Sequence, residues 1–115
     1  MKMRLVSILL IVIAVTLPAT AGVQDWSIGG AHVTYIEMKV GNGFRFSVDK
    51  QAGPCAANTW LIFDGRFYDS SLRADMVKTV YATILASKLS GQTLVLLGDN
   101  TPEVGGCVVG IVNSQ

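Results

Sequence analysis

The sequence has few of the residues that catalysis and metal binding use most. It contains one histidine, His32, and eight Asp and Glu residues. No Gly-x-Ser-x-Gly turn or comparable nucleophile turn is present, so a hydrolase triad built on His32 is not expected. The carboxylates show no spacing that indicates glycoside hydrolysis, and no spacing typical of metal ligands occurs. We therefore predict that the protein is not an enzyme and has no metal or cofactor site.

Cysteine is also scarce, with Cys55 and Cys107 the only two. They do not form the Cys-x-x-Cys spacing of zinc or redox motifs. In an exported protein, an even pair in separate segments indicates a disulfide. Such a bond would close a loop of about 50 residues, for which the chain-entropy model gives about 4 kcal/mol. A pair of metal-binding or catalytic thiols is the alternative.

One long apolar run is present, from Leu5 to Leu17. It is flanked by Lys2, Arg4, Pro18 and the small residues Ala19–Ala21. This is the pattern of a signal peptide. A bilayer span needs about 20 apolar residues, so cleavage is favoured over a membrane anchor. We expect residues 1–21 to be a signal peptide and 22–115 to form a single secreted or periplasmic domain without a stable membrane span.

The chain also has no large excess of positive or negative charge. Removal of Lys2 and Arg4 takes the formal net charge from +1 to −1, and the remaining charges are scattered singly. Nucleic-acid binding needs a basic face that meets the phosphates. We expect no nucleic-acid partner.

Residues 31–49 have the pattern of a hairpin. Polar and apolar residues alternate from Ala31 to Val40, which predicts a strand. Asn42-Gly43 is typical of a tight turn, and Phe44, Phe46 and Val48 then alternate with polar residues, so these three side chains are expected to point inward.

Three further strands and one helix complete the pattern. Trp60–Phe63, Thr93–Leu97 and Val108–Val112 are short apolar runs that predict strands, with a turn-rich loop from Gly98 to Gly106. Between the first two of these runs, apolar residues recur at three- and four-residue steps from Leu72 to Leu89, which predicts an amphipathic helix. Its N-cap is expected among Asp69, Ser70 and Ser71, and its end at Gly91.

The order of these elements is strand, strand, strand, helix, strand, strand. It predicts an α+β, mainly β fold, a small five-stranded OB-like barrel with one helix between strands 3 and 4 and one disulfide. An α+β sandwich with the helix on one face would have the same order.

Several aromatic residues fall outside the alternating core positions. Exposed aromatics with polar neighbours serve as stacking surfaces for sugars or proteins. We expect Trp60 in the core, whereas for Trp26, which precedes a predicted turn at Ser27–Gly30, both a binding role and a packing role stay open. The candidate ligand-binding residues are Trp26, Ser27 and Tyr35.

The mature chain resembles small secreted bacterial proteins related to the B subunits of subtilase-cytotoxin-type AB5 toxins. The resemblance rests on the hairpin, on the cysteine before a tryptophan-led strand, and on the segments Lys78–Ser87 and Ser90–Leu96, followed by a loop cysteine and a short final strand. It implies an OB-type fold, homopentamers, and recognition of sialylated cell-surface glycans with a serine near the first strand, for which Ser27 is the nearest candidate. The toxin-type subunits carry additional cysteines that this chain lacks.

Two functions follow as hypotheses. The first is a non-catalytic secreted binding subunit that recognises a glycan. The second is a periplasmic or extracellular domain that binds and modulates a protein partner.

Overall fold

The computed structural model describes residues 25–38, 43–103 and 106–115, which form six strands and one helix. The elements are β1 (Trp26–Ala31), β2 (Val33–Met38), β3 (Phe44–Val48), β4 (Leu61–Phe63), α2 (Arg73–Ser90), β5 (Leu94–Glu103) and β6 (Gly106–Ser114). The predicted signal peptide lies outside the described residues, as does Asn42 of the predicted hairpin turn. Within the described residues, no helix is long and apolar enough to cross a membrane.

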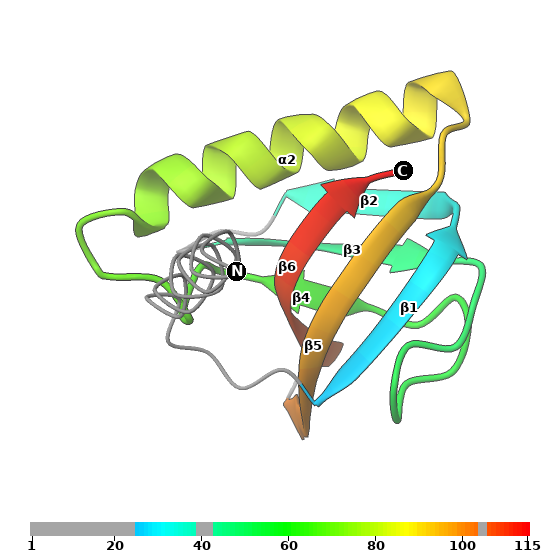
Figure 1. Cartoon of the computed structure of the whole chain (residues 1–115), viewed down its shortest axis with the longest axis horizontal. Helices are drawn as coiled ribbons and strands as arrows, with labels where there is room; N and C mark the ends of the chain where they lie inside the picture. Colours follow the sequence, from blue (N-terminus) through cyan, green and yellow to red (C-terminus); the bar gives the residue numbers. More distant parts are fainter. Residues whose placement is uncertain (1–24, 39–42, 104–105) are drawn as a thin grey trace, which may run out of the picture.

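The six strands form one sheet in the order β1-β5-β6-β4-β3-β2. All neighbours are antiparallel except β4 and β6, which run parallel. The mainly β, α+β class with one helix and one disulfide is confirmed, whereas the ladders form an open sheet of six strands in place of the predicted five-stranded OB-like barrel. The predicted first strand is divided at His32, where the chain leaves the β1–β5 ladder and enters the β2–β3 ladder (Figure 1).

The predicted hairpin is confirmed in its strands. β2 and β3 pair with Met38 opposite Phe44 and Glu37 opposite Arg45. Phe44, Phe46 and Val48 are buried, as the alternation predicts.

Two predicted turns are strands instead. Ser27–Gly30 belongs to β1, where Ser27 pairs with Leu97. The predicted loop from Gly98 to Gly106 continues β5 as far as Glu103, because β6 begins at Gly106 and pairs with it. Backbone pairing across the β5–β6 ladder therefore overrides the turn-type composition of this segment.

The helix α2 lies along one face of the sheet beside β2 and β6 (Figure 1). Val80 and Ile84 are buried in the core, but Leu72, Leu85 and Leu89 are 49%, 38% and 79% exposed. The predicted stripe was thus too wide, since at 3.6 residues per turn these leucines point away from Ile84.

The sequence predicts the C-terminal end of the helix correctly but not its N-cap. Gly91 ends it in the left-handed conformation at φ 78°, and its N–H donates to the carbonyl of Ser87, as expected. The predicted N-cap is wrong: Leu72 occupies that position, without a side-chain capping bond. The reason is a preceding turn in which the Leu72 N–H donates to the Asp69 carbonyl, so Asp69–Ser71 lie before the cap.

The predicted Cys55–Cys107 disulfide is present, with the two Cα atoms 6.3 Å apart. Cys107 is fully buried in β6, whereas Cys55 lies in the connection between β3 and β4. The bond therefore ties this connection to a central strand of the sheet.

Candidate functional site

Four side chains on β2, β3 and the residue before β4 form the candidate site. They are Tyr35, Glu37, Arg45 and Trp60, and we call them the outer strip. Side chains alternate along a strand, so Tyr35 and Glu37 share the face of β2 opposite to Ile36, which packs against the core. Arg45 pairs with Glu37 across the β2–β3 ladder and with Ile62 across the β3–β4 ladder.

Arg45 is the centre of the outer strip. Its Nε donates a hydrogen bond to Oε1 of Glu37. Its Cζ lies 4.5 Å from the centroid of the Trp60 ring, the geometry of a cation–π contact. The hydrogen bond from Arg45 lowers the pKa of Glu37 below its ordinary value. At neutral pH this pair is therefore a carboxylate hydrogen-bonded to a guanidinium.

Tyr35 extends the outer strip and is its most exposed member. The Tyr35 residue is 65% exposed. It stands about 7 Å along β2 from Glu37, because each residue of a strand advances by about 3.3 Å. The outer strip thus combines an open aromatic ring with a hydrogen-bond acceptor and a set of donors.

The three predicted ligand residues do not come together. Tyr35 lies in the outer strip, whereas Trp26 and Ser27 belong to β1 and pair with β5. Ser27 is exposed there. Trp26 is half-buried, its Nε1 donates to the Asp99 carbonyl at 2.8 Å, and its ring lies against Gly98 and Gly53. These contacts give Trp26 a packing role.

The sequence analysis missed Glu37, Arg45 and Trp60. Glu37 and Arg45 are opposite each other in the β2–β3 ladder, but a two-residue turn at Asn42-Gly43 would place Val40 opposite Arg45, so the predicted turn does not give this pairing. Trp60 was expected in the core, but it is half-buried with Arg45 over its ring. No sequence pattern reveals that contact, because it depends on β4 lying next to β3.

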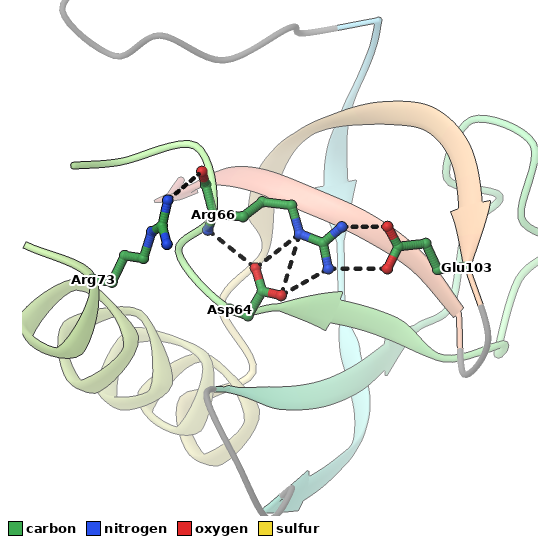
Figure 2. A network of polar contacts seen from close by, with 4 residues as sticks. All are labelled: Asp64, Arg66, Arg73 and Glu103. Atoms are coloured by element: carbon green, nitrogen blue, oxygen red, sulfur yellow. Dashed lines mark hydrogen bonds and ion pairs between the residues drawn. The ribbon is translucent and has the colours of Figure 1, made fainter. Parts of the chain in front are cut away.

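A second polar cluster surrounds Arg66, after β4 (Figure 2). Its guanidinium lies between two carboxylates: Nη2 donates to Asp64 at 2.7 Å and to Glu103 at 3.0 Å, and Nη1 also donates to Glu103. Hydrogen bonds from Arg66 to both acids raise the pKa of Arg66. Arg73 of α2 donates to the Arg66 carbonyl at 3.3 Å. The cluster joins the helix start to the far end of β5, which is a structural task.

A third polar contact lies at the junction of β1 and β2. The His32 N–H donates to Oδ1 of Asp49 at 2.8 Å, and the Asp49 N–H donates to the His32 carbonyl at 3.0 Å. Nδ1 of His32 lies 3.1 Å from Oδ2 of Asp49. The backbone hydrogen bond from His32 lowers the pKa of Asp49. This pair fixes the point at which the chain passes from one ladder to the other.

Across residues 25–38, 43–103 and 106–115, no group of three or more His, Cys, Asp or Glu side chains could hold a metal ion. Comparison with known proteins finds no matching family model, no matching curated protein and no matching solved structure. An exposed ring on the same face as a carboxylate–guanidinium pair is suited to binding, because the ring offers stacking and the pair offers hydrogen-bond donors and acceptors.

Proposed function

We propose that this chain is a non-catalytic secreted binding domain that recognises a glycan through the outer strip. The observation that carries the proposal is the exposed Tyr35 ring next to the Glu37–Arg45 pair. Sugar rings present C–H faces that stack on aromatic side chains and hydroxyls that both donate and accept hydrogen bonds. The disulfide supports an oxidising location such as the periplasm or the extracellular space.

The strand connections support an OB-type fold as part of this proposal. Only His32 separates β1 from β2, so the two can be counted as one bent strand that pairs with β5 at one end and β3 at the other. The order then becomes that of five strands with a parallel β4–β6 pair, and α2 connects β4 to β5. This connectivity is in keeping with the expected relation to secreted toxin B subunits.

A glycan array probed with the exported, purified protein tests the proposal. We expect binding to a defined set of glycans, loss of that binding in Tyr35→Ala, and retention in Ser27→Ala. Ser27 is a matched control because it is also exposed on a strand but lies in the β1–β5 ladder. An empty array with correctly folded protein would reject glycan recognition. Binding that depends on Ser27 and not on Tyr35 would move the site to β1.

Assembly into a homo-oligomer, a pentamer if the toxin relation holds, is part of the same proposal. Multi-angle light scattering of the exported protein measures its mass directly. A particle of several protomers is the expected result, and a monomer at all concentrations would contradict it.

A second candidate function is the binding and modulation of a protein partner. It is favoured by the outward face of α2, where Leu85 and Leu89 are exposed next to Ala82 and Ala86. Exposed apolar surface of this kind is typical of protein contacts. Purification from a native envelope fraction should then recover one reproducible partner, and the Leu85→Lys/Leu89→Lys variant should lose it. Failure to recover a partner across detergents and salt concentrations would count against this function.

A further inference from the structure

The charges of the outer strip are already matched within the protein. Glu37 and Arg45 carry one charge each, and they are joined by the hydrogen bond from Nε to Oε1. The Trp60 ring under the guanidinium holds Arg45 in this place. The strip therefore has a strongly polar centre with no net charge.

This pairing decides which hydrogen-bonding groups a ligand meets. The bond to Glu37 uses Nε of Arg45, and among the described residues the terminal Nη1 and Nη2 make no other side-chain hydrogen bond. The Arg45 side chain is 29% exposed and that of Glu37 is 47% exposed. A ligand at this position meets N–H donors next to carboxylate acceptors.

Two neighbouring hydroxyl groups fit such a pair well. One hydroxyl accepts from the Arg45 guanidinium while the next donates to the Glu37 carboxylate, and the bond between Arg45 and Glu37 stays in place. An anionic group fits less well than a hydroxyl, because an anion that accepts from the Arg45 donors lies near the Glu37 carboxylate, where like charges repel. The low pKa of Glu37 keeps this carboxylate ionised at neutral pH.

Tyr35 supplies the second half of the recognition. It stands on the same face of β2, about 7 Å from Glu37, which is within the reach of one six-membered sugar ring. Such a ring can stack its C–H face on Tyr35 while its hydroxyls reach Glu37 and Arg45.

We infer that the outer strip binds a neutral pyranose through two adjacent hydroxyl groups and discriminates against acidic sugars. The inference rests on the proposed glycan-binding function and narrows its ligand class. It departs from the sialylated ligands that the toxin resemblance implies.

The test is an array that pairs neutral glycans, ending in galactose, glucose, mannose or N-acetylglucosamine, with their sialylated, uronic-acid or sulfated counterparts. We expect the wild type to bind neutral members at least about tenfold more tightly than their acidic partners. In Glu37→Gln, Arg45 loses its internal counter-ion, so the preference should shrink at least about tenfold or reverse. Asp75→Asn, on the exposed N-terminal turn of α2, makes the same change in net charge and should leave the preference unchanged.

The outcomes separate the two proposals. Preferential binding of acidic glycans by the wild type would overturn the neutral-sugar inference and leave glycan recognition standing. An unchanged preference in Glu37→Gln would also overturn it. No binding to any member of the array by folded protein would overturn both the inference and the proposed function.

Discussion

The indole ring of Trp26 lies against the backbone of Gly98, its partner in the β1–β5 ladder. A Cβ atom at position 98 would stand 2.1 Å from Cζ2 of Trp26 and 2.6 Å from the Val108 carbonyl oxygen. The first of these contacts could be relieved by moving a side chain, but the second is with the backbone of the neighbouring strand. Gly98 is therefore required by the close packing at this point.

Gly98→Ala should lower the free energy of unfolding by about 1–3 kcal/mol, the usual cost of overpacking a tight site. Urea unfolding followed by far-UV circular dichroism measures the change. Gly29→Ala is the control, because a Cβ there meets no atom closer than 3.7 Å. Its effect should stay within about 0.5 kcal/mol. Equal effects at the two positions would contradict the close contact of Trp26 with Gly98.

Removal of the disulfide in Cys55→Ser/Cys107→Ser should lower the free energy of unfolding by about 4 kcal/mol, because the bond closes a long loop in the unfolded chain. The two residues are 52 apart in the sequence. Reduction of the wild type with dithiothreitol should shift its urea midpoint to that of the double variant. If thiol reagents react with the wild type when it is unfolded but not reduced, the disulfide does not form.

Loss of the Arg66 guanidinium should leave the carboxylates of Asp64 and Glu103 without their shared partner. About a third of the Arg66 side chain is exposed, at 34%, so solvent reduces the effect. We expect Arg66→Met to cost about 1–2 kcal/mol in thermal or urea unfolding, more than an isolated surface pair, because this guanidinium bonds two acids. Arg66→Lys keeps the charge but not the forked geometry, so its free energy of unfolding should lie between those of the wild type and Arg66→Met. If Arg66→Met leaves the free energy of unfolding unchanged, the cluster in Figure 2 contributes no stability.

The pairing of Asp49 with His32 should make stability depend on pH in the acid range. The folded-state pKa of Asp49 lies below the ordinary value of 3.8, so its contribution is complete above that pH and is lost as pH falls through the lower folded-state value. The difference in urea midpoint between the wild type and Asp49→Asn should therefore be largest near neutral pH and shrink below about pH 4. Asp69→Asn makes the same change in charge and serves as the control. A difference that stays constant down to about pH 2 would contradict this role.

The parts of the fold that the sequence predicted are those with local patterns. The β2–β3 hairpin follows from alternation on both sides of Asn42-Gly43, and α2 follows from the spacing of Met76, Val80 and Ile84. The extension of β5 to Glu103 could not be predicted, because its residues are typical of turns and only pairing with β6 makes them a strand. The division at His32 depends in the same way on partners far away in the sequence.

The candidate site, too, could be predicted only in part from local sequence patterns. Tyr35 was predicted as an aromatic residue outside the inward-facing positions, and its exposure agrees with that reasoning. The pairing of Glu37 with Arg45 depends on the register of the β2–β3 ladder, which a two-residue turn at Asn42-Gly43 does not give. The contact of Arg45 with Trp60 needed the three-dimensional neighbourhood of β3 and β4, and it is this contact that holds the guanidinium in place.

The parallel β4–β6 ladder joins two halves of the sheet that are otherwise built from separate partners. β2, β3 and β4 pair with their neighbours along the chain. β1 pairs instead with β5, and β4 pairs also with β6, where Leu61 is opposite Cys107. Contacts between residues so distant in sequence form slowly, since a long loop must close before they are made. The sheet thus becomes continuous only when the final segment of the chain arrives. Until β5 and β6 have been synthesised, β1 therefore lacks its ladder partner and β4 lacks one of its two.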